Sequence, residues 1–442
     1  MTLSKDWKIN KLGDISDIVY GKNLPTKSLK DSGYPVFGAN GIIGFNDRYL
    51  YENEMVLISC RGAASGKVNM SPKQCFITNN SLVLNLKEKN EEHKKYIYYF
   101  LHTINKSKIV TGSAQPQVTI NNVIDMQIPL PPLPTQKLIV SEIEKQFSRL
   151  DYGLESLKKI KTNLKNYKAS VLKSAVEGKL TEEWRKEYIK SPDFESANIL
   201  LEKILKAKKE KFLAENPGKK YKEAVIYKEV NEIVPNGWIL TNIGTILDFL
   251  TDYHANGSYE KLKEFVELFD SPGYALMIRS TNFEKNDFEI NTKYISEYAY
   301  ENLKKTKIYG GEILMSKIGN AGKVYLMPFL NKPCSLAMNL FMLRFNEFIV
   351  SKYIYYHLIS IKSKSQIRLF VKGVGNPTID KDSVRNIQIN LPPFKEQQKI
   401  VEEVESRLSI IEEMENLIDI NIKKANNLKQ SILKKAFSGE LI

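Results

Sequence analysis

The chain has 442 residues, of which 42% are hydrophobic and 26% charged, as in a folded protein rather than a disordered or low-complexity one. No uncharged apolar run approaches the ~18 residues of a membrane-spanning helix, and three cysteines without a CxxC pair argue against a disulfide framework or a metal site. The net charge of +14 favours a polyanionic partner such as nucleic acid, although an AT-rich genome that favours Lys codons would leave the same excess.

The N-terminus has no apolar segment typical of a secretory signal. Because disulfide frameworks belong to oxidising compartments, the few cysteines also favour a reducing one. We therefore expect a cytoplasmic protein without a membrane partner.

Short apolar runs bounded by Gly, Asn and Pro predict strands in two separate parts of the chain. In the first part they are Met55–Ile58 and Leu82–Leu84, and in the second part Glu312–Met315. Tyr-rich runs beginning at Lys95 and Lys352 predict short helices. The pattern indicates two mixed α/β domains.

Two long stretches carry apolar residues at steps of three and four, the period of an amphipathic helix. The first runs from Ile139 to Ala175 and the second from Val404 to Ala436. A helix of about 45 residues, which covers the whole block that contains either stretch, would span about 65 Å, which is too long for a compact domain. An apolar stripe of that length needs a partner, so we predict that the two helices pack as an antiparallel coiled coil.

The chain aligns with itself. Gln136–Val140 matches Gln397–Val401, and the match continues without a gap to Gly178 and Gly439. Further pairs lie upstream: Trp7 with Trp238, Ser59–Val68 with Ser316–Val324, Tyr96–Tyr99 with Tyr353–Tyr356, and Pro116 with Pro377. Tyr34–Gly41 has no clear counterpart. Such a repeat indicates two copies of one unit, related by an internal pseudo-two-fold.

The repeat defines the expected domain boundaries. Two globular recognition domains alternate with the two helices, and a charged, mostly helical bridge joins the halves. The boundaries are 1–132 for the first domain, 133–181 for the first helix, 182–235 for the bridge, 236–393 for the second domain and 394–442 for the second helix.

These features resemble the specificity (S) subunit of type I restriction–modification systems over essentially the whole chain. The resemblance rests on the doubled Leu-Pro-Pro…Gln…Ile-Val block, the doubled Leu-Lys…Ala…Gly…Leu ending, the stretch Gly178–Arg185 and the stretch Tyr34–Gly41. It implies a non-catalytic subunit whose two target-recognition domains each read one half of a split site in double-stranded DNA. It also implies that the helices separate the domains and dock two methyltransferase (modification) subunits, which restriction (translocase-nuclease) subunits join.

The alternatives are a stand-alone methyltransferase or nuclease, and a coiled-coil scaffold that does not bind DNA. Gly62–Lys67 resembles a phosphate-binding loop but has three residues between its glycines instead of four, and Val68 stands where a Ser or Thr is needed. Pro131–Pro132 follows Leu, so the polar residue of a methyltransferase tetrapeptide is missing. We therefore expect no catalytic residue, metal or cofactor in the chain.

Base readout requires Arg, Lys, Asn or Gln on loops that enter a DNA groove. The Gly-rich turns at Arg61–Lys67 and Lys317–Lys323 recur in both halves, as do two Gly/Pro loops, and Gly allows the backbone to approach a phosphate closely. The candidate DNA-binding residues are Lys22, Asn23, Arg61, Lys67, Gln115 and Gln117 in the first half, and Arg279, Lys317, Asn320, Lys323, Lys372 and Asn376 in the second. The DNA sequence, the methylated base and the presence of restriction do not follow from the residues.

Overall fold

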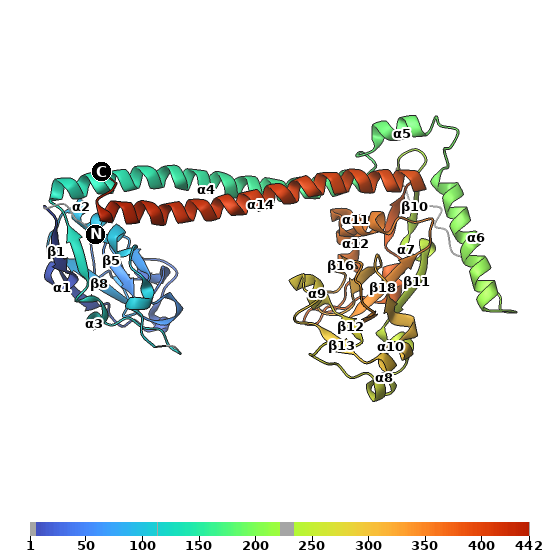
Figure 1. Ribbon diagram of the computed structural model, residues 1–442, viewed down its shortest axis with the longest axis horizontal. Coiled ribbons are helices and arrows are strands. Elements are labelled where there is room, and N and C mark those ends of the chain that lie inside the picture. Colours follow the sequence, from blue (N-terminus) through green and yellow to red (C-terminus); the bar gives the residue numbers. More distant parts are fainter. Residues whose placement is uncertain (1–5, 113, 222–233, 442) are drawn as a thin grey trace. The chain divides into compact units, whose positions relative to one another are not determined.

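The computed structural model describes residues 6–112, 114–221 and 234–441, and contacts divide the chain into two units. The first unit contains residues 1–161 and 416–442, and the second contains residues 162–415. Each unit holds one sheet-containing domain together with a part of each long helix (Figure 1). Residues 222–233 of the expected bridge lie outside the described part of the chain.

The first domain is built on a four-stranded antiparallel sheet. Its strands lie in the order β2 (Ser16–Tyr20), β8 (Ser81–Leu86), β5 (Val56–Ser59) and β6 (Val68–Met70). The other strands form a sheet of β4 (Ile42–Asn46), β3 (Tyr34–Phe37) and β7 (Phe76–Ile77), and a pair of β1 (Lys8–Lys11) with β9 (Gln127–Leu130). The helices are α1 (Leu12–Ile15), α2 (Glu91–Leu101) and α3 (Ile120–Val123).

The second domain repeats this topology. Its main sheet has the order β11 (Leu247–Asp252), β18 (Leu340–Phe345), β15 (Ile313–Ser316) and β16 (Val324–Leu326). A second sheet has the order β13 (Lys293–Ile295), β12 (Ala275–Ile278), β17 (Cys334–Leu336) and β14 (Lys307–Ile308), and β10 (Ile239–Asn242) pairs with β19 (Gln388–Leu391). The helices are α7 (Ile243–Ile246), α8 (Tyr259–Phe265), α9 (Ser280–Lys285), α10 (Glu297–Asn302), α11 (Ser351–Ile359), α12 (Ile361–Phe370) and α13 (Lys381–Arg385).

The repeat extends beyond what the sequence alignment detects. Strand β3 is parallel to β7 and antiparallel to β4, and β12 is parallel to β17 and antiparallel to β13. The stretch Tyr34–Gly41, which has no counterpart in the sequence, therefore has one in the fold at residues 275–282. The prediction of two mixed α/β domains is confirmed.

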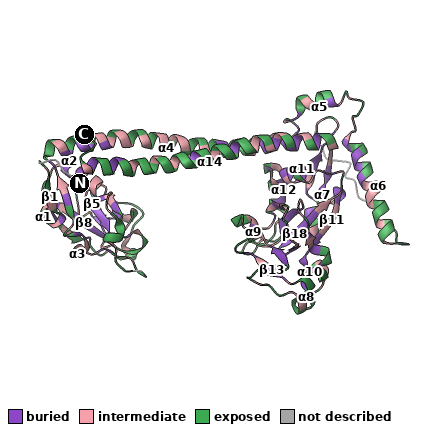
Figure 2. Cartoon of the chain, in the orientation of Figure 1, coloured by how far each residue is buried: buried purple, intermediate pink, exposed green. Residues whose placement is uncertain are grey.

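The central strands are continuous apolar runs because both of their faces are covered. In β5, Val56 and Ile58 belong to the core that includes α2, whereas Leu57 packs with Phe37 on the other face. Figure 2 shows buried residues along the strands of both domains and alternating burial along the helices.

The long helices are α4 (Leu133–Val176) and α14 (Phe394–Ser438). In the first unit they run antiparallel, since Lys161 Nζ lies 2.6 Å from Asp419 Oδ1 while Lys429 Nζ lies 2.5 Å from Asp151 Oδ1. Buried residues of both helices join the core of the first domain: Ile139, Val140 and Ile143 from α4, and Ile432, Leu433, Ala436 and Phe437 from α14.

The second unit uses the opposite ends of the same helices. Val171, Leu172 and Ala175 from α4 and Ile400, Val401 and Val404 from α14 lie in one core with the second domain. The bridge forms α5 (Glu182–Tyr188) and α6 (Ala197–Glu215), and Leu200, Leu201 and Ile204 of α6 are buried in this core. The helical stripes predicted from sequence therefore pack as expected in each unit.

A buried glutamine explains one identity of the repeat. Gln136 Nε2 donates to Pro131 O at 2.9 Å, and Gln397 Nε2 donates to Pro392 O at 3.1 Å. The side-chain oxygens have different partners: Gln136 Oε1 lies 2.9 Å from His93 Nδ1 in the first unit, and Gln397 Oε1 accepts from the Val350 amide at 2.9 Å in the second. The glutamine thus fastens the start of each long helix to its own domain.

Candidate nucleic-acid interface

In the first domain the Gly-rich turn Ser59–Lys67 and the Gly/Pro loop Thr111–Val118 are joined into one surface. The Gly62 amide donates to Pro116 O at 3.1 Å, and the Val118 amide donates to Cys60 O at 3.0 Å. Ser65 Oγ also donates to Pro116 O, at 2.7 Å. These bonds hold two loops that are distant in sequence side by side.

The second domain builds the same frame from the turn Ser316–Lys323 and the loop Lys372–Ile379. The Gly319 amide donates to Pro377 O at 3.0 Å, and the Ile379 amide donates to Lys317 O at 3.1 Å. The turn itself closes in the same way in both domains, with the Ser59 amide donating to Lys67 O and the Ser316 amide donating to Lys323 O, each at 2.8 Å. We call each such combination a loop pair.

The first loop pair brings together four of the predicted DNA-binding residues. Arg61, Lys67, Gln115 and Gln117 are all exposed, and Arg61 and Gln117 form an isolated antiparallel bridge. No ion pair engages Arg61 or Lys67 among the described residues. Their charges are therefore available to a partner.

A third cation lies beside Lys67. Burial lowers the pKa of His102, and the charges of Lys106 and Lys67 lower it further. Lys106 is exposed, and a Cβ on Gly66 would meet its side chain at 3.4 Å. The neighbourhood of the first loop pair is thus positive, and Lys106 is a residue that the sequence argument did not select.

Lys22 and Asn23 do not belong to the loop pair, but they lie at the adjoining edge of the first domain. The Lys22 amide donates to Ile77 O at 2.9 Å, and the Asn79 amide donates to Lys22 O at 3.1 Å. Both predicted side chains are exposed. They are placed by the segment that follows β7 rather than by either loop.

The cations of the second loop pair have acidic partners. Lys317 Nζ lies 2.8 Å from Asp252 Oδ2, and Lys372 Nζ lies 3.4 Å from Asp380 Oδ2. Asn376 is exposed at the tip of the Gly/Pro loop. In this domain the predicted cations are engaged within the protein.

Glu284 on α9 holds the two remaining predicted residues of the turn. Asn320 Nδ2 donates to Glu284 Oε1 at 2.8 Å, and Lys323 Nζ donates to the same oxygen at 3.3 Å. The hydrogen bond from Asn320 has the largest effect on the pKa of Glu284, and together with the bond from Lys323 it lowers that pKa. The carboxylate is therefore ionised at neutral pH and partly neutralises the turn.

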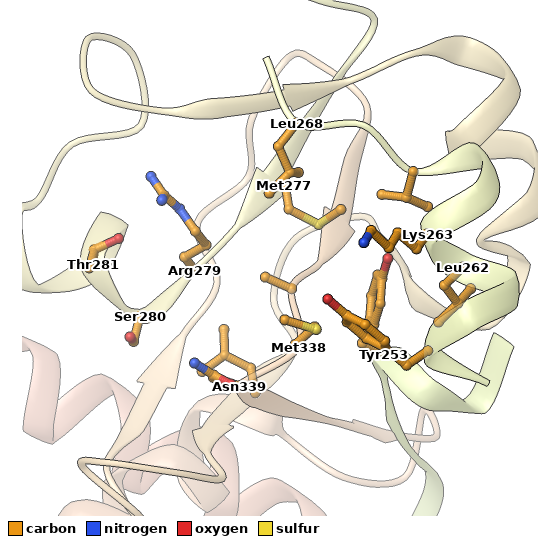
Figure 3. Close-up of a pocket in the computed structure, with 14 residues that line it drawn as sticks. Tyr253, Leu262, Lys263, Leu268, Met277, Arg279, Ser280, Thr281, Met338 and Asn339 are labelled. Carbon is orange, nitrogen blue, oxygen red and sulfur yellow. The ribbon is translucent and has the colours of Figure 1, made fainter. Parts of the chain in front are cut away.

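Arg279 does not belong to either loop of the pair and lies on the wall of a pocket of about 420 Å³. Its Nη2 donates to Asn291 O at 3.4 Å, and its buried Nε has no hydrogen-bond partner among the described residues. Figure 3 shows Met277 and Met338 facing Tyr253 across this pocket, with Arg279 on the side away from α8. The sequence alone did not indicate this pocket.

Asp252 and Lys381 are further charged residues that sequence reasoning missed. Asp252 ends β11 and is buried, and each of its oxygens accepts from a lysine, Lys317 or Lys381. Burial alone would raise the pKa of Asp252, but the bonds from the two lysines bring it below its ordinary value. No local sequence signal marks this contact, because its members come from three separate segments.

A second buried carboxylate fastens the start of α14. Glu396 Oε1 accepts from Thr181 Oγ1 at 2.7 Å and from Arg185 Nη1 at 2.9 Å, while Oε2 accepts from Trp238 Nε1 at 2.7 Å. Burial raises the pKa of Glu396, against the opposing effect of these donors. The arrangement joins the bridge to the second domain and presents no open face to a ligand.

Within the described residues, no group of three or more His, Cys, Asp or Glu side chains could hold a metal ion. Burial raises the pKa of the Cys75 thiol to about 11 and that of Cys334 to about 12, so neither is an activated nucleophile. No helix in the described ranges is long and apolar enough to cross a membrane.

Comparisons with known proteins indicate the family of this chain. A family model described as type I restriction modification DNA specificity domain matches residues 4–166 and 256–430. The EcoDI specificity subunit of Escherichia coli is 24% identical over 99% of this chain and 89% of its own length. The MjaVIII specificity subunit of Methanocaldococcus jannaschii is 21% identical over 100% of this chain and 94% of its own length.

Two solved structures share the fold. A chain from a study of assembly and conformational transition of the type I R-M system has a TM-score of 0.65 at 16% identity, with 100% of both chains covered. The HsdS subunit of Thermoanaerobacter tengcongensis has a TM-score of 0.50 at 16% identity, covering 100% of this chain and 99% of that one.

The predictions of a specificity subunit, and of a recognition protein rather than an enzyme, are confirmed by the family match and by the relatives that are named specificity subunits. This chain belongs to the family of type I restriction–modification DNA specificity proteins.

Proposed function

We propose that this chain is the subunit that recognises DNA for a type I restriction–modification complex, and that each domain reads one half of a bipartite site. The observation that carries the proposal is the loop pair, which occurs in both domains with the same backbone hydrogen bonds. Two equal frames with different side chains are suited to reading two different half-sites. The assigned domains are 1–132 and 236–393.

Within each loop pair we assign different tasks to different residue types. In the first domain Arg61 and Lys67 contact phosphates or guanine edges, and Gln115 and Gln117 contact adenine edges. In the second domain Asn376 and Arg279 are the base-reading candidates, because Lys317, Asn320 and Lys323 already hold partners within the protein. Lys372 is the phosphate candidate, since its pair with Asp380 is mostly exposed and therefore weak. Lys22 and Asn23 extend the first surface.

The long helices carry a second exposed surface, which we assign to two methyltransferase subunits. In the first unit Leu138, Tyr152 and Ile160 of α4 and Leu417, Ile420 and Leu428 of α14 are exposed, and in the second unit Tyr167 of α4 and Ile410 and Met414 of α14 are exposed. Apolar side chains that the chain itself leaves uncovered are typical of protein interfaces.

Restriction subunits would join this assembly. The helices at 133–181 and 394–442 would then set the spacing between the half-sites, and the bridge at 182–235 joins the two halves of the chain. The place of action is the cytoplasm, where the DNA of a bacterial or archaeal cell lies.

The proposal is tested by sequencing DNA methylation in cells with and without the gene for this chain. We expect one bipartite methylated motif to disappear when the chain is absent. Purified chain with its modification subunits should bind that motif with an affinity that falls as salt rises. Methylation by the chain alone would favour a stand-alone enzyme, and the absence of salt-dependent DNA binding would favour a scaffold.

A further inference from the structure

A buried carboxylate lies beneath the second loop pair and connects its two loops. Asp252 Oδ2 accepts from Lys317 Nζ at 2.8 Å, and Asp252 Oδ1 accepts from Lys381 Nζ at 2.7 Å. The Asp252 side chain is only 9% exposed, whereas those of Lys317 and Lys381 are 25% and 32% exposed. The carboxylate therefore lies below two lysines that reach the surface.

The positions of the two lysines show what this contact holds. Lys317 begins the Gly-rich turn, and its backbone oxygen already accepts from the Ile379 amide of the Gly/Pro loop. Lys381 opens α13, directly after that loop. Asp252 itself ends β11 in the main sheet. One carboxylate thus ties both loops to the rigid sheet of the domain.

Among its described residues, the first domain has no such contact. Tyr20 pairs with Leu82 in the way that Asp252 pairs with Phe341, so Tyr20 occupies the place of the carboxylate. Cys60 begins the Gly-rich turn in place of Lys317, and Ile120 opens α3 in place of Lys381. All three charges are absent there, although the backbone frame of the loop pair is the same. The carboxylate is therefore not a requirement of the fold.

The charges of this cluster also bear on how the second domain binds a polyanion. Two lysines with a free ammonium group would each release counterions from DNA and bind any sequence. A carboxylate within hydrogen-bond distance of both competes with phosphate for the same donors and leaves one net positive charge instead of two.

We infer that Asp252 is a positioning residue that makes the second domain selective. It fixes the Gly-rich turn through Lys317 and the Gly/Pro loop through Lys381, and it withholds both ammonium groups from DNA phosphates. Binding by this domain then depends on base contacts from the positioned loops. The inference rests on the proposed function, because it assigns a role within the same DNA-reading surface.

The test uses the full chain assembled with its modification subunits and three variants. Asp252→Asn keeps the size of the side chain and removes its charge. Asp270→Asn is the matched control, because it makes the same charge change in the same domain at an exposed pair with Lys293. Asp252→Asn combined with Lys381→Met restores the net charge of the cluster without restoring the contact. Binding is measured over a range of salt on the cognate site and on sites with either half altered.

For Asp252→Asn we expect the slope of log affinity against log salt to steepen by about one to two, because up to two lysines become free for phosphates. Discrimination against an altered second half-site should fall about tenfold, while discrimination at the first half-site stays as in the wild type. The double variant leaves only Lys317 free, so its salt slope should be about one less steep than that of Asp252→Asn, while the poor discrimination remains. That combination separates positioning from charge, and a general loss of structure would instead weaken binding to all sites.

The inference is overturned if Asp252→Asn behaves like Asp270→Asn, or if the double variant recovers discrimination. If Asp252→Asn does not fold, Lys381→Met alone provides an independent test. This variant leaves the Asp252–Lys317 pair in place, and it should still reduce discrimination at the second half-site. Failure of the wild-type complex to bind DNA specifically would refute the proposed function instead. The two failures are therefore distinguishable.

Discussion

The two loop pairs share the same backbone hydrogen bonds, but their cations have different surroundings. In the first domain Arg61 and Lys67 end in solvent without an ion pair among the described residues, whereas in the second domain Lys317 and Lys323 are held by Asp252 and Glu284. Backbone hydrogen bonds do not depend on residue identity, so the frame can repeat while its side chains differ. The backbone hydrogen bonds therefore place the two loops, and the side chains decide how strongly and how selectively each domain binds its DNA half-site.

The largest expected effect comes from destabilising the core of one unit while the core of the other unit stays intact. Ile143 of α4 is fully buried in the first unit, and Val404 of α14 holds the aligned position in the second unit. Replacing either by Asp buries an unpaired charge and should destabilise its own unit by about 3–5 kcal/mol. Ile143→Asp should abolish recognition of the first half-site, and Val404→Asp that of the second.

Methylation mapping and two-stage thermal unfolding would measure both variants. Ser148→Asp is the control, because Ser148 lies on the same helix, is exposed and is not one of the residues assigned to the methyltransferase surface. If either buried variant removed both half-sites equally while its unfolding stayed confined to one unit, the two regions would not be independent readers.

A second prediction concerns the two helix ends that complete the domains, which should be able to replace each other. The first domain takes Phe437 from α14, whose ring lies 5.1 Å from Tyr96 and 5.2 Å from Phe100. The aligned residue in the second unit is Val176 of α4, which is also buried. A fragment of residues 1–185 should therefore form a two-fold homodimer in which the second copy's α4 replaces α14 and Val176 replaces Phe437.

Valine is smaller than phenylalanine, so Val176 leaves a void in the homodimer at the place of the Phe437 ring. Val176→Phe should fill this void and strengthen the dimer by roughly 1–2 kcal/mol. Sedimentation or size-exclusion chromatography over a range of concentrations would show the difference. With modification subunits, the dimer should methylate a palindromic site made of two first half-sites. A fragment that stays monomeric at all concentrations would contradict the equivalence of the two helix ends.

The electrostatic difference itself predicts unequal salt dependence. Arg61→Ala and Lys67→Ala should each reduce the slope of log affinity against log salt by about one, because each removes a free cation from the DNA surface. Lys323→Ala should reduce the slope by much less, since Glu284 already neutralises that lysine. Equal reductions for Lys67→Ala and Lys323→Ala would show that the pairing seen in the free protein does not persist on DNA.

The last prediction concerns pH, and its effect is small at neutral pH. Burial lowers the pKa of His357 to about 3, while its Nε2 accepts from the Asn390 amide at 3.1 Å and its Nδ1 lies 2.8 Å from Ser363 Oγ. An unfolded histidine titrates near 6.5, so the unfolded chain binds the extra proton first. Stability from this site is present above pH ~6.5 and is lost as pH falls below it, at up to about 1.4 kcal/mol per pH unit.

The first domain has Phe100 at the aligned position, so the part of the pH dependence that comes from His357 should belong to the second domain, whereas the lowered pKa of His102 contributes in the first domain. Replacing His357 by Gln removes the titrating ring and keeps an acceptor for the Asn390 amide. Unfolding of this variant should show a flatter dependence between pH 6.5 and pH ~5 than the wild type. An unchanged dependence would assign the effect to another group.

The sequence by itself determined the number of units, the class of each domain and the two long helices. These features have local or periodic causes, because apolar residues at Ile139 and Ile143 or at Val56 and Ile58 mark a face whatever lies opposite. The repeat then indicated which loops correspond, and it selected Arg61, Lys67, Gln115 and Gln117, which the fold brings together on one surface.

Only the tertiary structure decided which of those charges remain free. Lys67 and Lys323 align in the sequence, yet one ends in solvent and the other lies 3.3 Å from Glu284, which belongs to a helix that the alignment does not match. Asp252 likewise meets Lys317 and Lys381 across separations of 65 and 129 residues. Coulomb interactions act through space and not along the chain, so the setting of each cation becomes defined only when the fold brings its neighbours to it.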